Sequence, residues 1–287
     1  MKPPPAGRLI CLGDVMLDVL AQLPGPLATG SDTPAPITFS PGGSAANTAA
    51  WLGWLGTPVT FVGRIGDDAF GAEAVASLRR LGVLTAVTID FERPTGVCLV
   101  LVSPDGERTM VPSAGANSGL AADDVLTSVT AEDHLHLSGY SLLNPESRPA
   151  ALAALAAAGS CSVDAASAAP IRAAGAEQFL QWLPAGALVL ANADELAALG
   201  GDPAALVRRG LTLVVKDGAA GARLADRDGI RTVATAAVPV RDSTGAGDAF
   251  AAGLLAAWWS GTTLLDAVAA GNAAGARALA TVGGRPA

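Results

Sequence analysis

Short apolar runs alternate with longer helix-like stretches along most of this chain, and this alternation constrains the fold most strongly. The expected strands lie at Arg8 to Val15, Val59 to Gly63, His134 to Leu137, Cys161 to Asp164, Ala187 to Leu190 and Leu211 to Val215. The main expected helices lie at 43–55, 70–81, 122–129, 149–157, 171–183, 246–259 and 264–280. Strands that alternate with helices form a mostly parallel sheet covered by helices. Ligands of such folds bind beyond the carboxyl ends of the strands.

Two stretches depart from this alternation. Residues 22–41 are rich in Pro, Gly and Thr, and residues 86–111 carry the short β-like runs Ala86 to Asp90, Val97 to Val102 and Arg108 to Val111. A Pro-Asp-Gly turn at 104–106 separates the last two runs. We expect these segments to pair with each other as a small separate sheet.

Composition excludes several classes of protein. The 287 residues carry 18 Lys and Arg against 26 Asp and Glu, a formal charge of −8, and 51% of them are hydrophobic. Such a chain buries a large core and lacks the basic surface that neutralises nucleic-acid phosphates. Its apolar runs are shorter than the roughly 18 residues that span a bilayer. Three scattered cysteines fit reduced, buried thiols, so we expect a cytoplasmic protein without a nucleic-acid or membrane partner.

The most informative segment is residues 242–250, which read DSTGAGDAF and lead into an apolar helix. Gly245 and Gly247 let successive backbone N–H groups converge, and the helix N-terminus adds partial positive charge. The segment therefore predicts an anion hole with a carboxylate, Asp248, placed to take a proton from an attacking hydroxyl. The alternative is an ordinary helix start, in which a Ser or Thr caps the helix and Asp248 favours its dipole.

This string resembles the second signature of the ribokinase-like (PfkB) family of carbohydrate and nucleoside kinases. Residues 42–47, GGSAAN, and 63–71, GRIGDDAFG, resemble the family's first signature, and the similarity runs from Leu9 to Gly283. The resemblance implies one kinase domain over 1–287, with a three-layer α/β/α fold, a mostly parallel central sheet and a small β-sheet lid. The lid would comprise about 19–41 and 91–113.

The resemblance also implies roles for particular residues. The catalytic set would be Asp248 as general base with an anion hole at Gly245, Ala246 and Gly247. Acceptor contacts would come from Asp18, Gly43, Ser44, Asn47 and Ser138. ATP would contact Asn192, Lys216, Gly218, Gly221 and Asn272. Glu195 would serve Mg²⁺, and an activating K⁺ would lie near Asp242, Thr244, Ala278, Thr281 and Gly283.

Each of these positions also has an ordinary structural interpretation. Asn192 and Glu195 have the spacing of a helix capping box. Gly218 and Gly221 suit a tight turn, and Asn272 suits a hydrogen-bonded helix amide. Asp18 fits a solvated turn, and Asn47 fits a helix cap. Motifs of other nucleotide-binding proteins, the Walker P-loop and the G-x-G-x-x-G fingerprint, are absent from the sequence.

The acceptor is the least determined part of the prediction. Ser44 stands where ribokinases carry Lys, and Ser138 where they carry a sugar-binding Glu, so strict ribose specificity is not expected. A nucleoside base usually stacks on aromatic side chains, and the expected lid offers little beyond Phe39 and Phe91. The sequence therefore favours a small sugar or sugar acid as the acceptor. A nucleoside kinase is the alternative, and a non-catalytic sensor is a third hypothesis. The lid would also join two copies in a homodimer.

The chain has two histidines, and both are candidate metal ligands. His134 and His136 lie two residues apart on an expected strand and so face the same side. No Cys, His or carboxylate motif accompanies them. We expect them to make hydrogen bonds at a strand edge.

Overall fold

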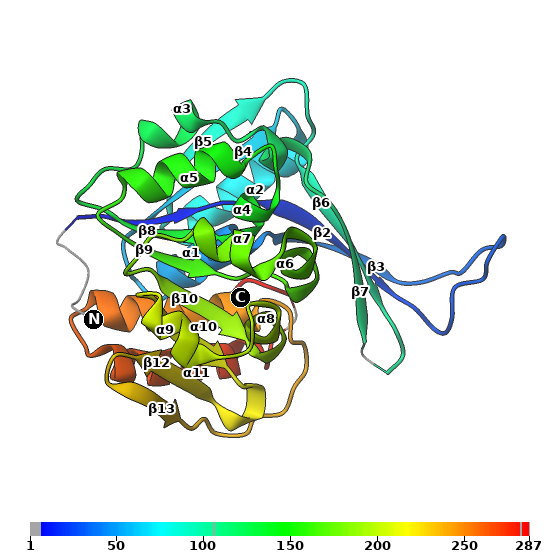
Figure 1. Ribbon diagram of the computed structural model, residues 1–287. Coiled ribbons are helices and arrows are strands. Elements are labelled where there is room, and N and C mark those ends of the chain that lie inside the picture. The colour runs from blue at the N-terminus through cyan, green and yellow to red at the C-terminus, as the bar shows by residue number, and fades with distance from the viewer. Residues whose placement is uncertain (1–6, 106, 282, 287) are drawn as a thin grey trace.

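The computed structural model describes residues 7–105, 107–281 and 283–286 (Figure 1). Its main element is a nine-stranded sheet in the order β13-β12-β11-β10-β9-β8-β1-β4-β5. These strands are β1 (Leu9–Leu12), β4 (Val59–Gly66), β5 (Leu84–Asp90), β8 (His134–Ser138), β9 (Ser160–Asp164), β10 (Leu188–Asn192), β11 (Thr212–Lys216), β12 (Ala222–Asp226) and β13 (Gly229–Val233). Neighbours from β11 through β5 run parallel, and β12 and β13 form an antiparallel edge.

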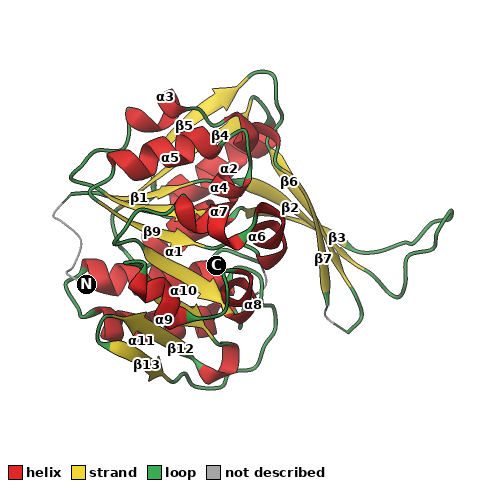
Figure 2. Cartoon of the chain, viewed as in Figure 1, coloured by secondary structure: helices red, strands yellow, loops and turns green. Residues whose placement is uncertain are grey.

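Helices cover both faces of this sheet (Figure 2). One layer holds α1 (Ser44–Trp54), α2 (Ala69–Arg80), α10 (Ala246–Trp259) and α11 (Leu264–Ala278). The other layer holds α3 (Ala122–Leu126), α4 (Gly139–Leu143), α5 (Arg148–Ala157), α6 (Ala168–Ala174), α7 (Ala176–Gln181), α8 (Ala193–Ala198) and α9 (Pro203–Arg208). Each layer packs on its own apolar cluster, because both faces of the central strands are buried. The predicted three-layer α/β/α fold is confirmed.

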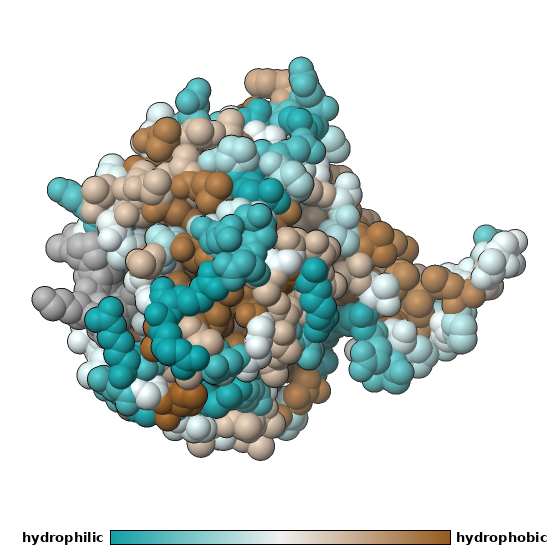
Figure 3. All heavy atoms as spheres, viewed as in Figure 1, coloured by the Kyte–Doolittle hydropathy of each residue, from teal (hydrophilic) through white to brown (hydrophobic). Residues whose placement is uncertain are grey.

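The small sheet projects from one side of this body as a long arm (Figures 1 and 3). It has the order β3-β2-β6-β7, from β2 (Met16–Gln22), β3 (Ile37–Gly42), β6 (Gly96–Val102) and β7 (Arg108–Ser113). Side chains alternate between its faces. Even-numbered residues such as Asp18, Val100 and Met110 face a cavity beside the large sheet, and odd-numbered residues lie on the opposite face. We call this element the lid.

Three details differ from the sequence predictions. The expected strand over 8–15 ends early, at Leu12, and residues 13–15 form a short break before the chain enters the lid at Met16. The run 86–90, expected in the small sheet, belongs to β5 and pairs with β4 in the large one. The expected helix over 171–183 is broken at Gly175, whose φ of 90° is unfavourable for other residues.

The two histidines lie inside the sheet and not at an edge. Strand β8 is flanked by β9 and β1, and both imidazoles are buried. His134 and His136 contact the Ser162 hydroxyl at 3.0 and 2.9 Å, and His134 also contacts Ser160 at 2.8 Å. Across the described residues, no cluster of three or more His, Cys, Asp or Glu side chains suits a metal ion. The described helices include none with the length and apolar character needed to cross a bilayer.

Candidate active site

A cavity of about 700 Å³ lies between the carboxyl ends of the parallel strands and the inner face of the lid. Its lining comes from segments far apart in the sequence, because parallel strands bring their following loops to one edge. The predicted site residues that line it are Asp18, Gly43, Ser44, Asn47, Asn192, Glu195, Lys216, Gly218, Thr244, Gly245, Gly247 and Asp248.

The glycine-rich loop ends where helix α10 begins. Gly245 adopts a left-handed conformation with φ of 70° at the N-cap position, which favours glycine. A Cβ at this position would also lie 2.5 Å from the Cα of Gly284, so the close approach of the two segments requires a bare backbone. The first N–H groups of a 14-residue helix therefore face the cavity end that Gly245 and Gly247 line.

Asp248 lies in the first turn of α10, against the first turn of α1. Its carboxylate accepts hydrogen bonds from the Ser44 hydroxyl at 2.9 Å and from the Asn47 amide at 3.0 Å. Burial raises its pKa to about 7, and the negative charges of Asp164 and Asp14 add to this rise, whereas the two hydrogen bonds oppose it. A carboxyl with such a pKa exchanges protons near neutral pH, as a general base requires.

The acceptor side of the cavity begins at Asp18 on β2. This side chain is buried, and burial raises its pKa to about 6 although the positive charge of Arg285 lowers it. Gly43 precedes α1 with φ of 94°, and a Cβ there would lie 2.5 Å from the Asp14 carbonyl oxygen. Asp14 caps α1 by accepting from the Ser44 amide at 2.8 Å. These contacts hold Ser44 and Asn47 at the cavity wall.

Ser138 is the one predicted acceptor residue that the structure keeps away from the cavity. It ends β8 fully buried, and its hydroxyl makes no hydrogen bond with any residue that the structure describes. Strand β8 continues directly into α4, whose residues Tyr140 and Ser141 line the cavity instead.

The opposite end of the cavity is strongly polar. The Lys216 ammonium ends β11 and pairs with Asp164 at 2.9 Å. Burial lowers the pKa of Lys216, but the Asp164 and Glu195 carboxylates outweigh this effect, so the pKa lies above its ordinary value. A Cβ on Gly247 would lie 3.2 Å from Lys216 Nζ, which places this cation beside the glycine loop.

Asn192 and Glu195 form the capping box that their spacing allows. The Asn192 side chain accepts from the Glu195 amide at 2.8 Å, and Glu195 Oε2 accepts from the Asn192 amide at 2.7 Å. Both residues also line the cavity, so the structural and the site interpretations hold together. Burial raises the pKa of Glu195, which Lys216 partly offsets.

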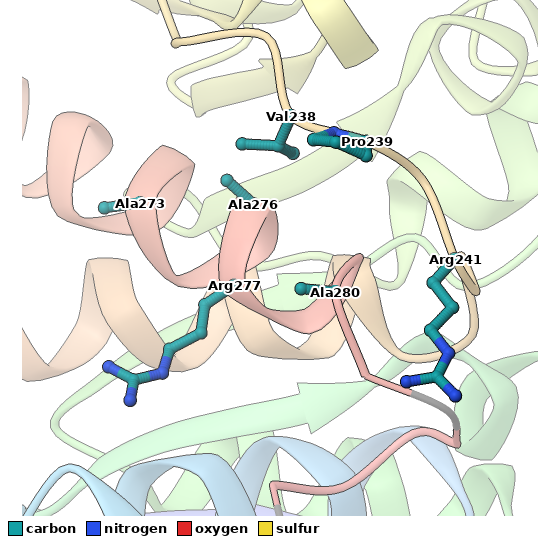
Figure 4. A pocket seen from close by; sticks show the side chains of 7 residues that line it. All are labelled: Val238, Pro239, Arg241, Ala273, Ala276, Arg277 and Ala280. Carbon is teal, nitrogen blue, oxygen red and sulfur yellow. The ribbon is translucent and has the colours of Figure 1, made fainter.

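Two predicted nucleotide contacts lie outside this cavity. Gly221 follows the turn 218–220 with φ of 94°, and a Cβ there would strike the Val233 carbonyl. The Asn272 amide of α11 donates to that carbonyl at 3.0 Å. Next to Asn272 on α11, Ala273 and Ala276 line a largely apolar hollow. Val238 and Pro239 also line it, with Arg241 and Arg277 at its sides, as Figure 4 shows.

Two of the predicted cation residues, Thr244 and Gly283, contact Asp242. Its carboxylate accepts from the amides of Gly283 at 2.9 Å and Thr244 at 2.7 Å, and it pairs with the guanidinium of Arg108 from the lid. Burial raises the pKa of Asp242, but these amide hydrogen bonds lower it below its ordinary value. Among the described residues, the buried Thr244 hydroxyl has no hydrogen-bond partner. The Ala278 carbonyl accepts from the Thr281 amide at 3.0 Å.

Sequence reasoning missed several residues of the cavity. Asp14 lies two residues after β1, and Asp164 is the last residue of β9. The rule that sites gather at the carboxyl ends of parallel strands would therefore have found both. Asn117 lies in a short 3-10 helix, Gly115–Gly119, and holds the backbone of Val15 through two hydrogen bonds of 3.1 and 3.0 Å. No spacing in the sequence signals that contact.

A nucleotide-sized cavity with a glycine anion hole and a buried carboxylate of raised pKa is the arrangement of a phosphotransferase. The family profile described as pfkB family carbohydrate kinase matches residues 6–287. The chain belongs to this family and is an ATP-dependent phosphotransferase that acts on an alcohol group.

Known relatives agree with this assignment. The chain is 32% identical over 286 residues to an ATP-dependent ribose-1-phosphate kinase of Halopiger xanaduensis, which covers 98% of this chain and 94% of the relative. It is 32% identical to a fructokinase of Escherichia coli, over 87% of this chain and 84% of that one. The adenosine kinase structure of Sinorhizobium meliloti superposes with a TM-score of 0.86 at 24% identity, covering 98% and 96% of the two chains.

Proposed function

We propose that this kinase transfers the γ-phosphoryl group of ATP to a hydroxymethyl group of a small neutral sugar, with Asp248 as general base. The observation that carries this proposal is the position of Asp248, which lies buried between the glycine loop and the residues that face the acceptor, with a pKa of about 7. The test is ADP release with Mg-ATP and a panel of sugars, sugar acids and nucleosides. Release that does not depend on any acceptor would argue against the proposal.

The reaction needs little covalent chemistry from the protein. The acceptor oxygen forms a bond to the γ-phosphorus, its proton passes to an Asp248 carboxylate oxygen, and the bond to the leaving oxygen of ADP breaks. Backbone N–H groups of Gly245, Ala246 and Gly247 stabilise negative charge on the phosphoryl oxygens. Asp18 and Asn47 orient the acceptor so that its hydroxyl faces the phosphorus. Lys216, beside Gly247, faces the same negative charge.

The polar end of the cavity fits Mg²⁺. Asp164 and Glu195 offer carboxylate oxygens beside the glycine loop, and Mg²⁺ is usually held by one or two carboxylates together with phosphates and waters. Glu195 and Asp164 would hold the ion, directly or through water. When bound, Mg²⁺ supplies positive charge that neutralises the phosphates of ATP.

The groups around Asp242 include one feature that supports a monovalent cation site and one that opposes it. The Thr244 hydroxyl, which has no hydrogen-bond partner in the part of the chain that the structure describes, supports an oxygen site for K⁺, formed with Asp242, Ala278, Thr281 and Gly283. However, the guanidinium of Arg108 already pairs with Asp242. We therefore propose K⁺ activation that is modest in the wild type and stronger in Arg108→Ala. Equal rates of both proteins in K⁺ and in a K⁺-free buffer would contradict this.

The charge of the cavity favours a neutral acceptor over a sugar acid. Five carboxylates line it, from Asp14, Asp18, Asp164, Glu195 and Asp248, whereas Lys216 is the one cationic side chain among its described lining residues. Lys216 lies at the phosphate end and is paired with Asp164. An acidic acceptor would thus meet like charge on the cavity wall, whose one lining cation is already paired.

A nucleoside is the second candidate acceptor, and the inner face of the lid favours it. Met16, Val100 and Met110 give this face an apolar character, and Tyr140 lines the cavity opposite. Phe39 and Phe91, the lid aromatics expected to stack on a base, line no part of this cavity and are 64% and 81% exposed. Tyr140→Ala should therefore weaken a nucleoside substrate more than a free sugar in kcat/KM measurements.

The adenine of ATP is proposed to lie beside Asn272, in the apolar hollow of Figure 4. The segment from Val238 to Arg241 borders this hollow and leads directly into the glycine loop, so a triphosphate can run from one to the other. Turns at Gly218 and Gly221 shape the other side of that path. Ala276→Trp would fill the hollow, and an unchanged KM for ATP in this variant would count against the placement.

The outer face of the lid supports a homodimer. The cross-strand row Phe39, Val19, Leu99 and Val111 runs over all four strands and is apolar throughout. Phe39 and Val111 are 64% and 54% exposed in the single chain, and contiguous apolar surface of this kind commonly marks an interface. We propose that two lids pack through this row. Size-exclusion chromatography with light scattering should show a dimer for the wild type and a monomer for Phe39→Asp.

A cytoplasmic location remains part of the proposal. It is supported by the use of ATP and by three free, buried cysteines, Cys11, Cys98 and Cys161, which suit a reducing compartment. Localisation of a tagged protein in cell fractions tests it.

A further inference from the structure

The segment 283–286, which follows α11, is built into the wall of the active site. The Gly283 amide donates to Asp242, and the Gly284 carbonyl accepts from the Trp51 indole at 3.0 Å. A Cβ on Gly284 would lie 2.5 Å from the Asn47 amide nitrogen. The segment therefore connects the glycine loop to helix α1, the two elements that meet at Asp248.

Arg285 is the next residue, and its guanidinium is buried in an unusual way. It is 9% exposed, and its Nε donates to Asn47 Oδ1 at 3.1 Å, its Nη1 to the Ser77 hydroxyl at 2.9 Å and its Nη2 to the Gly42 carbonyl at 3.2 Å. Among the described residues, no carboxylate forms a direct ion pair with it. Burial of a cation with only neutral hydrogen-bond partners lowers the stability of the fold, which points to a role for Arg285 other than stability.

That role concerns the orientation of the Asn47 side-chain amide. An amide side chain has one accepting oxygen and one donating nitrogen. Because Arg285 donates to Oδ1, the Nδ2 group must point the other way, and it donates to Asp248 Oδ2 at 3.0 Å. A reversed amide would set its oxygen against the Asp248 carboxylate and its NH₂ group against the guanidinium. Arg285 thus determines which way Asn47 faces.

We propose that Arg285 is a positioning residue for phosphoryl transfer, which holds Asn47 so that its amide donates to Asp248. This inference rests on the proposed function of Asp248. Its second contribution is positive charge at a wall otherwise rich in carboxylates. The charged and titratable groups that face Asp248 are Asp14, Asp18, Asp164, Lys216, Tyr140 and Arg285. Arg285 lowers the pKa of Asp18, and loss of its charge would raise the pKa values of both neighbouring carboxyls.

The test compares Arg285→Met with Ser77→Ala. Ser77 lies on α2, lines no part of the cavity and shares only the Nη1 hydrogen bond, so its variant loses structural support without loss of the Asn47 contact. We expect Arg285→Met to lower kcat/KM for the acceptor roughly 10-fold to 100-fold, as a misplaced catalytic group does, with KM for ATP nearly unchanged. We also expect the acid limb of its pH profile to move to higher pH. Ser77→Ala should change neither.

A double-mutant cycle separates positioning from stability. If Arg285 acts mainly through Asn47, most of the loss in kcat/KM caused by Arg285→Met disappears in the Asn47→Ala background. Additive losses, or a pH profile identical to that of Ser77→Ala, would overturn the proposal. If Arg285→Met does not fold, Arg285→Lys keeps the charge with weaker geometry, and full activity of that variant would refute the need for the Nε contact.

The same experiment distinguishes this proposal from the proposed function. If the folded wild-type protein phosphorylates no acceptor, the proposed function is refuted. If the wild type is active and the Arg285 variants keep that activity, only the role proposed for Arg285 is refuted. Calorimetric binding of the acceptor to wild type and to Arg285→Met provides a readout that does not depend on turnover.

Discussion

Replacement of Asp248 by Asn tests the mechanism most sharply, and its effect can be worked out from the contacts of the carboxylate. Loss of a general base lowers kcat by about 10²- to 10⁴-fold, or roughly 2.7–5.4 kcal/mol at 1.36 kcal/mol per factor of ten. The carboxylate also accepts two hydrogen bonds, from Ser44 and Asn47. An amide accepts one of them but sets its NH₂ group against the other donor, which costs about another 1 kcal/mol. The loss should fall in the upper half of this range.

The assay is steady-state ADP release with saturating acceptor, together with calorimetric binding of ATP, which should stay within about threefold of wild type because Asp248 faces the acceptor. A matched control is Asp14→Asn, the same chemical change in the same cavity, where the carboxylate caps α1 and acts on Asp248 only through its charge. That variant should lose less than about tenfold, the typical effect of one cap. If Asp248→Asn retained near-wild-type kcat, or if both variants lost activity equally, Asp248 would not be the base.

Three further predictions concern the same cluster. Because the Ser44 hydroxyl donates to Asp248, Ser44→Ala should lower kcat/KM for every acceptor by a similar factor of about five, worth ~1 kcal/mol, and unequal factors would assign Ser44 a role in acceptor choice. The wild-type kcat/KM should decline as pH falls below about 7, since the base must be deprotonated and its pKa is about 7, and a flat profile from pH 8 to 5 would contradict the assignment. This carboxyl has a pKa raised from 3.8 in the unfolded chain to about 7 in the fold, so its ionisation destabilises the protein increasingly as pH rises from 4 to 7. The melting temperature of Asp248→Asn should therefore exceed that of wild type by more at pH 8 than at pH 5, and an equal difference at both pH values would rule out this linkage.

Much of the fold was accessible from the sequence because local pattern and global architecture agree. Alternating strands and helices predicted the layered fold, and the string at 242–250 placed the glycine loop and Asp248 at the start of a helix. The error at β5 has a physical reason. This strand is at the edge of the large sheet and is only half-buried, so its alternating pattern resembles that of a lid strand.

Contacts between distant segments were beyond the reach of sequence pattern. The hydrogen bond from Arg285 to Asn47 joins residues 238 positions apart, and the pair of Arg108 and Asp242 joins residues 134 apart. No periodicity or spacing encodes such pairs, because they arise only when the lid, α1 and the segment after α11 are packed together. Ser138 illustrates the converse. It directly follows the expected strand over 134–137, but the turn into α4 buries it and presents Tyr140 to the cavity.

The central claim is that ATP phosphorylates a hydroxymethyl group of a neutral acceptor in the cavity beneath the lid. The most direct measurement is ³¹P NMR of reactions that contain the wild-type protein, Mg-ATP and matched pairs of a neutral sugar and its sugar acid, with nucleosides in parallel. We predict a new phosphomonoester signal, coupled to the protons of a primary carbon, with a neutral acceptor and not with its acid partner. A product formed only from the acids, or ADP without any phosphorylated acceptor, would contradict the account.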